Sequence, residues 1–278
     1  MTYDRAPPQL EPSLVGEGIA SIHGELTDTV RLAHILRQSR PSVIVHLAAI
    51  TGIAACAQSR EESFRTNVYG TFCLAKAIAD ANLSTKLIFA SSREVYGEST
   101  DDRTSEEDPC VPNNVYGMTK LLGEQVIKWV SSKLEIPYTI LRFTNLYGPG
   151  GDKYAPCVFI RRALRGEDIE IMGGDQIVNL VYVDDAVRAL EVCMDTTEAD
   201  REVFNLGSEE SMTVRDLVAL IVKLIGTDVT LKQAPMRDTE TRHFIPDLQK
   251  IRRVLGFRTS IGLEEGLRRT ITYSRRTL

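Results

Sequence analysis

Several features that would point to particular functions are missing from this sequence. No apolar run approaches the ~20 residues that a membrane-spanning helix needs. Acidic residues outnumber basic ones by 38 to 33, and a formal net charge of -5 argues against nucleic-acid binding, for which a basic surface is expected. The first residues, Met1 to Arg5, lack the apolar core of a signal peptide, so we expect a cytoplasmic protein.

Paired cysteines are also missing. The five cysteines are odd in number and scattered, at Cys56, Cys73, Cys110, Cys157 and Cys193, and no Cys-x-x-Cys pair occurs. This pattern is typical of reduced thiols in a cytosol and predicts neither a disulfide framework nor a metal site.

The pattern of apolar residues predicts alternating strands and helices. Strands are expected at 19–22, 42–47, 86–90, 138–142, 169–171, 202–206 and near 229–232. Helices are expected at 28–39, about 61–81, 116–133, 157–165, 185–194, 213–225, near 247–255 and near 263–273. Such alternation predicts parallel βαβ units in an α/β fold of substantial core. Before them, Pro7, Pro8, Pro12, Gly16 and Gly18 predict an irregular segment.

One helix carries a pair of residues with a chemical use. Tyr116 and Lys120 lie four residues apart, so a helix places the phenol and the ammonium on one face, ~6 Å apart along the axis. A free tyrosine titrates near ~10. A cation at ~4 Å contributes roughly 4 kcal/mol at an effective dielectric of ~20, which lowers the pKa by about three units. The pair therefore predicts a tyrosinate available near neutral pH, although Tyr-x-x-x-Lys alone also fits an ordinary amphipathic helix.

A third group comes from the preceding strand. The short apolar strand that begins at Lys86 ends in two serines, Ser91 and Ser92. In open α/β sheets the carboxyl ends of the strands are where ligands bind. Ser92, Tyr116 and Lys120 together can remove the proton of a substrate alcohol while a hydride leaves its carbon.

With these residues, an ordered series of short motifs resembles a known family. The stretches are Gly24–Asp28, His46–Ala49, Asn67–Thr71, Ser91–Gly97, Tyr116–Glu124, Leu141–Gly150, Val181–Asp185 and Phe204–Gly207. The chain is similar to extended short-chain dehydrogenases/reductases of the NAD-dependent epimerase/dehydratase kind, which act on nucleotide sugars. Each motif is weak, but their order from about residue 20 onward is specific.

The resemblance implies a fold and a division into domains. We expect a Rossmann-like, doubly wound parallel sheet with a smaller α+β C-terminal domain for the substrate. The NAD-binding domain would comprise 1–146 plus about 176–207, and the substrate domain 147–175 plus 208–278. The family also implies a homodimer that packs through the helices at 61–81 and 116–133.

The family's glycine-rich turn is not found in this sequence. Family members open with a strand, a Gly-x-x-Gly-x-x-Gly turn and a helix that binds the cofactor pyrophosphate. Here Tyr3, Asp4 and Arg5 resemble the end of the family's second strand. We therefore expect a truncated form of the functional enzyme, lacking about 30 residues and the central first strand. The strand at 42–47 would then have an unpaired edge.

The resemblance assigns catalytic roles. Tyr116 would deprotonate the sugar hydroxyl as hydride passes to NAD, Lys120 would hold the cofactor ribose and lower the pKa of Tyr116, and Ser92 would hydrogen-bond the reacting oxygen. An epimerase returns the hydride to the other face of the ketone, so NAD stays bound. The implied substrate is a UDP-hexose, such as UDP-glucose, epimerised at C4.

Glu94 separates this reaction from its alternatives. In the family's dehydratases an Asp-Glu pair occupies positions 93 and 94, whereas here the pair is Arg93 and Glu94. An arginine is charged at any working pH and cannot act as the acid, so dehydration is disfavoured. UDP-glucuronate decarboxylation, another nucleotide-sugar oxidoreduction, or a non-catalytic homologue remain open. By resemblance, Glu94 is expected to be a catalytic residue beside Ser92, Tyr116 and Lys120; the alternative is a solvated loop carboxylate paired with Arg93.

Further contacts follow from the resemblance alone. Cofactor-binding residues would be Asp4, Glu25, Leu26, Leu47, Ala48, Ala49, Asn67, Ser91, Tyr116, Lys120 and Phe143. Asn145 and Arg237 would reach the substrate diphosphate, together with Ser92 at the sugar. Val178 stands where the family usually has a second phosphate-binding arginine. Asp4 favours NAD over NADP, although Arg5 weakens that preference.

Other polar residues are expected to have structural rather than catalytic or metal-binding roles. His46 lies in a buried strand and is expected to be a core histidine. Asp184 and Asp185 are expected to cap a helix rather than bind a metal. The arginines near the end, Arg268, Arg269, Arg275 and Arg276, are expected to form a solvated face.

Overall fold

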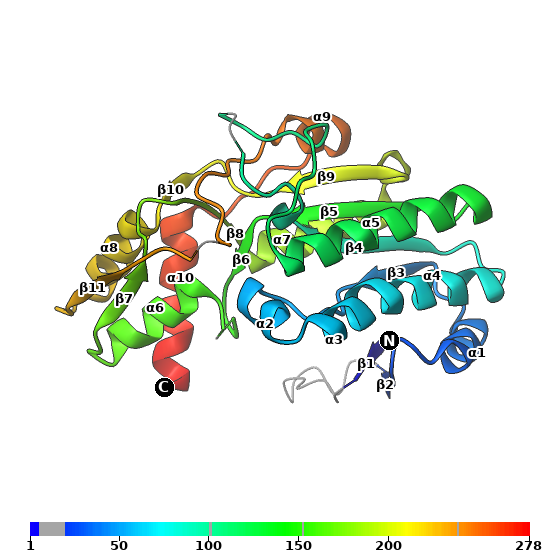
Figure 1. The fold of residues 1–278 in the computed structure, drawn as a ribbon, viewed down its shortest axis with the longest axis horizontal. Helices are drawn as coiled ribbons and strands as arrows, with labels where there is room; N and C mark the ends of the chain where they lie inside the picture. Colours follow the sequence, from blue (N-terminus) through cyan, green and yellow to red (C-terminus); the bar gives the residue numbers. More distant parts are fainter. Residues whose placement is uncertain (6–19, 100–101, 152, 238) are drawn as a thin grey trace.

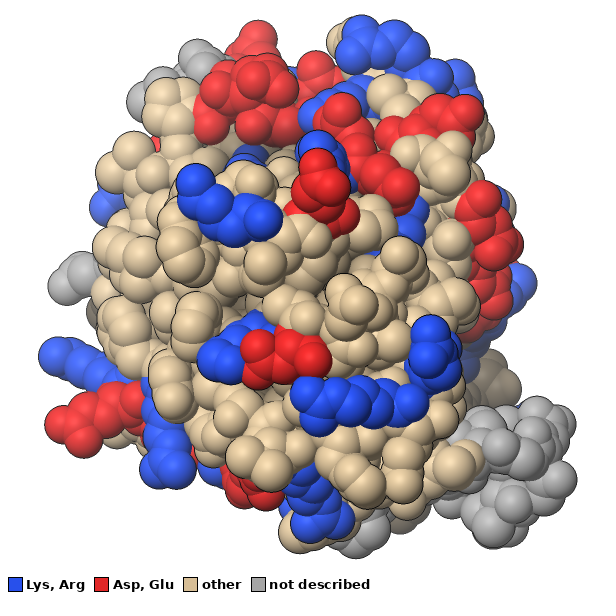
Figure 2. All heavy atoms as spheres, turned by 90° about the vertical axis from the view of Figure 1, so that its right-hand side faces the viewer, with Lys and Arg blue, Asp and Glu red and all other residues tan. Residues whose placement is uncertain are grey.

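The computed structural model describes residues 1–5, 20–99, 102–151, 153–237 and 239–278 (Figure 1). The irregular segment predicted around Pro7 to Gly18 lies outside these residues. Within the described part of the chain, no helix is both long and apolar enough to cross a bilayer. Figure 2 shows one face of the molecule, on which acidic and basic side chains are interspersed around uncharged surface.

A parallel sheet forms the larger half of the molecule. Its strands run in the order β3 (Val43–His46), β4 (Lys86–Ser92), β5 (Tyr138–Phe143) and β9 (Glu202–Leu206). Most residues of β4 are buried on both faces, which explains why its sequence is a continuous apolar run. Because the strands are parallel, their carboxyl ends share one edge of the sheet.

Helices cover both faces of this sheet. α1 (Thr29–Ser39), α4 (Gly70–Asp80) and α5 (Val115–Leu134) pack on the face that carries Leu87 and Phe89. α7 (Val183–Asp195) and α9 (Gln249–Leu255) pack on the opposite face with Ile88. Alternate residues of β4 thus enter different cores, and the predicted doubly wound α/β architecture is confirmed.

The first two strands stand apart from the main sheet. Within the described ranges, β1 (Thr2–Asp4) and β2 (Ser21–His23) pair in parallel with each other and with no further strand. Among the described residues, β3 pairs with β4 on one edge and has no partner on the other. The unpaired edge expected for the strand at 42–47 is therefore found, and Val43, Ile44 and Val45 are only half-buried.

A second core lies beside the carboxyl end of the sheet (Figure 1). It contains a sheet in the order β10 (Ser211–Thr213), β8 (Ile177–Tyr182), β6 (Asn145–Tyr147), and the pair β11 (Leu231–Ala234) and β7 (Ile169–Met172). Its helices are α6 (Ala155–Leu164), α8 (Val214–Ile225) and α10 (Leu263–Thr277). β8 contributes to this core while α7 returns to the first sheet, so the chain crosses between the two. The domain boundaries given above stay a prediction.

The single helix expected at 61–81 is wrong in detail. The segment consists of α3 (Arg60–Phe64), a π-helix, η1 (Arg65–Tyr69), and α4, and a separate short helix, α2 (Ile53–Gln58), precedes it. A π-turn inserts one extra residue and rotates the side chains beyond it. In η1 it accompanies the inward placement of Asn67, which is buried. The short strands β6, β8 and β10 were not expected either.

The helix cap expected from Asp184 or Asp185 is also wrong. α7 begins after Tyr182, and no side chain caps it. Asp185 is buried and accepts hydrogen bonds from the backbone N–H groups of Ser260 and Ile261. It anchors the segment before α10, while Asp184 lies 3.5 Å from the guanidinium of Arg269.

Candidate active site

Three predicted residues come together at the carboxyl end of β4. Ser92 is the last residue of the strand, and its Oγ accepts a hydrogen bond from the backbone N–H of Glu94 over 3.2 Å. Tyr116 lies in the first turn of α5, with its side chain next to that of Ser92. Lys120, one turn later, places its Nζ 5.9 Å from the centre of the Tyr116 ring. The sequence spacing thus produces the predicted convergence of Ser92, Tyr116 and Lys120, which together form the relay.

The ammonium of Lys120 is bonded to the strand rather than to the phenol. Its Nζ donates to the carbonyl of Ala90 over 2.7 Å and lies 5.0 Å from the centre of the Phe89 ring. The side chain is buried, and burial lowers the pKa of Lys120 to about 8 because the charged form loses its hydration.

The expected lowering of the tyrosine pKa by Lys120 is not found. Burial raises the pKa of Tyr116 above its ordinary value, and the hydrogen bond with Ser92 offsets this in part. The physical reason is geometric: the Lys120 Nζ is engaged with Ala90, and it faces the ring rather than the hydroxyl. Deprotonation of Tyr116 therefore needs more positive charge than Lys120 supplies in this arrangement.

Glu94 is held in place by two neighbours. Its Oε1 lies 2.9 Å from an Nη of Arg93, and its Oε2 accepts a hydrogen bond from the Nδ2 of Asn114 over 2.8 Å. Glu94 is buried, so the carboxylate is not a solvated loop residue. Arg93 also lies 5.5 Å above the ring of Phe244. Glu94 thus pairs with Arg93 and lies next to Ser92, and its catalytic role stays a prediction.

A glycine allows this loop to approach the helix. The nearest atom to a Cβ placed on Gly117 would be the backbone oxygen of Glu94, at 2.1 Å. Real Cβ atoms do not tolerate such a distance, so only glycine permits α5 and the Glu94 loop to pack as they do.

The residues expected to line a cofactor divide into two groups. Leu47 and Ala48 are exposed beyond β3, and Ala49 and Phe143 are half-buried. Asp4 and Glu25 are exposed at the β1–β2 end, and Leu26 is half-buried against Gly70.

The side chains of Asn67 and Ser91 are instead used within the protein. Asn67 bonds both the N–H and the C=O of Ile50, and its Nδ2 also donates to Thr119. Ser91 donates to Glu124 over 2.5 Å.

The residues expected at the substrate diphosphate are less closely grouped. Asn145 Nδ2 donates to the carbonyl of Asn179 over 3.0 Å, which ties β6 to β8. Arg237 is exposed and pairs with Glu240 at 3.2 Å. Val178 is half-buried in the second core and supplies no charge. The roles of these residues stay predictions.

His46 is a core residue, as expected. It is buried, and burial lowers its pKa to about 3. Its Nε2 lies 2.9 Å from Thr71 Oγ1, whose proton is donated to the carbonyl of Asn67. The imidazole must therefore be the donor in this contact, and the ring is neutral.

Sequence reasoning missed four residues that support the site. Asn114 caps α5 by accepting from the N–H of Gly117 and also holds Glu94. Glu124 and Arg142 form a buried ion pair, and Tyr96 contacts Arg142. An arginine inside the apolar strand Tyr138–Phe143 is the signal that could have revealed the pair, since a buried cation needs a buried anion.

Comparison with known proteins finds similarity along most of the chain. The sequence model described as "NAD dependent epimerase/dehydratase family" matches residues 4–207. A UDP-glucose 4-epimerase of Lactobacillus helveticus is 27% identical over 257 residues, which are 84% of this chain and 77% of the relative. A UDP-N-acetyl-alpha-D-glucosaminuronate decarboxylase of Bacillus cytotoxicus is 29% identical over 288 residues, covering 93% and 87%.

Solved structures show the same Rossmann-type fold. The UDP-glucose 4-epimerase of Thermotoga maritima, with UDP-glucose, has a TM-score of 0.92 at 30% identity and covers 99% of this chain and 90% of that one. The UDP-glucuronic acid 4-epimerase of Bacillus cereus, in complex with UDP-glucuronic acid and NAD, has a TM-score of 0.90 at 26% identity, covering 96% and 85%.

Proposed function

Because the chain belongs to the NAD-dependent epimerase/dehydratase family, we propose that it epimerises a UDP-hexose at C4 with NAD as cofactor. The observation that carries this proposal is the convergence of Ser92, Tyr116 and Lys120 at the carboxyl end of β4. The 4-epimerases among its relatives support the choice of reaction.

Each residue has a defined task in this reaction. Tyr116 accepts the proton of the C4 hydroxyl, and Ser92 holds the oxygen as the C–O bond gains double-bond character. When bound, NAD would supply the hydride acceptor for the oxidation at C4, the hydride donor for the return step, and the positive charge of the oxidised nicotinamide. Lys120 keeps its ammonium between Ala90 and the ring. Tyr116 then returns the proton, so the reaction has no net oxidation.

Some residues of this chain are suited to binding parts of NAD. The carboxyl edge presents Leu47, Ala48 and the buried Lys120, and Asp4 lies exposed at the end of β1, where a ribose would be bound. The printed sequence has no glycine-rich turn whose backbone N–H groups could hold a pyrophosphate. We therefore propose weak NAD binding for this 278-residue chain. Isothermal titration measures it, and tight stoichiometric binding would overturn the expectation.

A decarboxylase is the second candidate, and the buried Glu94 favours it. Glu94 is a carboxylate that Arg93 and Asn114 hold beside the relay. It could act on a substrate sugar whose C6 is a carboxylate, the kind of substrate for which the relative from Bacillus cytotoxicus is named. Arg93 in place of an acid disfavours dehydration.

Product analysis distinguishes the candidates. UDP-glucose and UDP-glucuronate are each incubated with the protein and NAD, and products are followed by proton NMR. Conversion of UDP-glucose to UDP-galactose without NADH release supports the proposal, whereas carbon dioxide from UDP-glucuronate selects the decarboxylase. Tyr116→Phe is the control and should lower turnover by about 10²–10⁴-fold without changing the unfolding midpoint. A folded protein that turns over neither substrate, even with a glycine-rich strand–turn–helix supplied upstream, would be a non-catalytic homologue.

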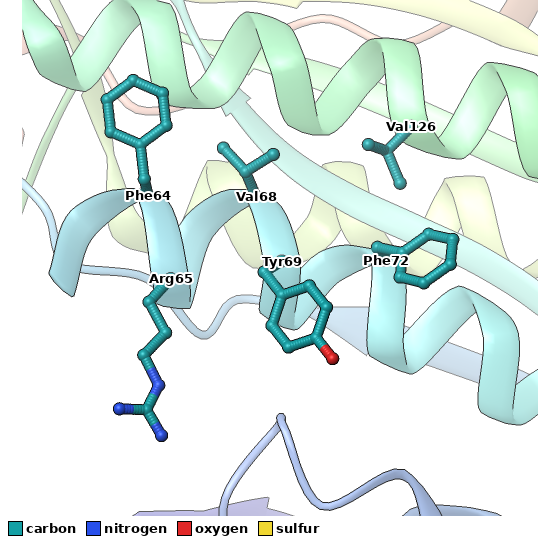
Figure 3. A pocket seen from close by; sticks show the side chains of 6 residues that line it. All are labelled: Phe64, Arg65, Val68, Tyr69, Phe72 and Val126. Carbon is teal, nitrogen blue, oxygen red and sulfur yellow. The ribbon is translucent and has the colours of Figure 1, made fainter. Parts of the chain in front are cut away.

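We also propose a homodimer through the helices around η1 and α5. Phe64, Val68 and Phe72 lie with Val126 of α5 around a shallow apolar pocket (Figure 3). Tyr69 is 54% exposed and stacks on Phe72 with ring centres 6.3 Å apart. Trp129 of α5 is 59% exposed. Exposed aromatic side chains on two adjacent helices are typical of a surface that another protein covers, and a second copy is the occupant that the family implies.

A further inference from the structure

A buried ion pair lies one helical turn beyond the relay. Glu124 follows Lys120 by four residues on α5 and is fully buried. Arg142 of β5 donates to it through two nitrogens, Nε to Oε1 over 3.0 Å and Nη2 to Oε2 over 2.7 Å. This bidentate geometry fixes the helix against the strand in both distance and orientation.

Hydrogen bonds connect the ion pair of Glu124 and Arg142 to the segments that surround Glu94. Arg142 Nη1 donates to the hydroxyl of Tyr96 over 2.8 Å, and that hydroxyl donates to Oδ1 of Asn205 over 2.7 Å. The same Nη1 donates to the carbonyl of Glu106 over 3.3 Å. Tyr96 is two residues after Glu94, so the chain of bonds links α5, β5, β9 and the Glu94 loop.

The pair also sets how α5 lies along β4. Three consecutive strand residues face three helix residues spaced four apart. The side chain of Ser92 lies next to that of Tyr116, Ser91 donates to Glu124, and the carbonyl of Ala90 accepts from Lys120. A shift of the helix would break these contacts together.

Stability alone does not account for a buried pair of this kind. Replacing a buried ion pair by apolar residues of similar volume is often neutral or stabilising, because both charges lose their hydration. The ion pair instead fixes one arrangement of α5 against the strands. We propose that Glu124 and Arg142 are positioning residues that hold Lys120 and Tyr116 against β4 and couple them, through Tyr96, to the Glu94 loop. The proposal rests on the proposed function only in treating Lys120 as a catalytic group.

The pair has an electrostatic consequence at Lys120. The titratable groups that face this ammonium are His46 of β3, Cys56 of α2, and Tyr116 and Glu124 of α5. Of these, His46 is neutral and Glu124 carries a negative charge that favours protonated Lys120. Loss of that charge should leave Lys120 easier to deprotonate.

The test uses Glu124→Gln in the full chain, with the lysine side chains labelled at ¹³Cε. The Lys120 signal is assigned by its loss in Lys120→Arg, and its titration is followed by NMR without substrate or cofactor. We expect the pKa of Lys120 to fall by about one unit or more, from its value of about 8, because an opposite charge about one turn away is lost. Hydrogen exchange of the backbone amides at 93–97 should also become faster. Thr139→Val, which removes a buried hydrogen bond from β5 to Ala199, is the matched control and should change neither readout.

Should Glu124→Gln fail to fold, the double variant Glu124→Gln/Arg142→Met removes both charges and leaves no unpaired ion. The double variant is expected to show the faster exchange at 93–97 and a smaller fall of the Lys120 pKa. A Lys120 titration and an exchange pattern that match the wild type in the variant that folds would overturn the proposal. Because neither readout needs turnover, an inactive chain with a shifted Lys120 would contradict the proposed function and not this inference.

Discussion

The Nδ2 of Asn114 donates to the carboxylate of Glu94 over 2.8 Å, while the Oδ1 of the same side chain accepts from the N–H of Gly117 at the start of α5. One amide thus caps the helix that carries Tyr116 and fixes the carboxylate that borders the relay. The two ends of the amide have opposite polarity, and each is used for a different partner.

Substitutions at Asn114 should separate these two tasks. Asn114→Asp retains an N-cap acceptor but places a carboxylate against Glu94, so we expect turnover to fall by at least about tenfold while the helix stays capped. Asn114→Ser keeps the cap and removes the contact, and its loss should be smaller. Turnover and urea unfolding of both variants provide the measurement. Turnover equal to that of the wild type in both variants would show that the contact with Glu94 is unimportant.

Substitution of Gly117 should disturb the same loop. Gly117→Ala puts a methyl group at 2.1 Å from the backbone oxygen of Glu94, so the loop or the helix must move. We expect a loss of about 1–3 kcal/mol in the free energy of unfolding, the usual cost of overpacking. Gly262→Ala, where the nearest atom is 3.4 Å away, is the control and should cost less. Urea unfolding decides between them.

The buried His46 should make the protein sensitive to acid. Its folded pKa of about 3 lies below the ordinary value of 6.5, so the unfolded chain binds a proton that the folded chain excludes. Stability is therefore present above pH ~6.5 and is lost as the pH falls toward ~3. When the pH is lowered from 7 to 5, this residue should reduce the free energy of unfolding by about 2 kcal/mol. His46→Gln should lack that part of the slope in urea unfolding at the two pH values, whereas the exposed His23→Gln should behave as the wild type.

Charge at the apolar surface should prevent association of two copies. Tyr69→Asp places a carboxylate beside Phe72 and Val126, so a dimer through this face would bury an unpaired charge. Light scattering after size exclusion should report a dimer for the wild type and a monomer for the variant. Tyr273→Asp, at an exposed tyrosine on α10, should leave the mass unchanged. A wild-type monomer at tens of micromolar concentration would contradict the proposed dimer.

The relay could be predicted from the sequence because its geometry is local. A four-residue helical spacing joins Tyr116 to Lys120, and an apolar run that ends in Ser92 marks the end of a strand. The contact between them follows from how parallel strands and helices pack. The predicted pKa effect was not found because it depends on where the ammonium points, and Lys120 points to Ala90.

The supporting polar residues could not be predicted because their partners are distant in the sequence. Glu124 and Arg142 are 18 residues apart on different elements. Asn205 reaches Tyr96 across 109 residues. The π-helix at Arg65–Tyr69 accompanies the bonds of Asn67 to Ile50 and Thr119, and helix periodicity encodes neither.

The edges of β1 and β3 that lack a partner among the described residues bear on how the protein behaves in a crowded solution. Backbone N–H and C=O groups at regular spacing can recruit a strand from another polypeptide. During refolding, neighbouring chains would compete for these groups, so recovery of native protein should decline as its concentration rises. The half-buried valines and isoleucine of Val43–His46 mark the place where such aggregates would nucleate.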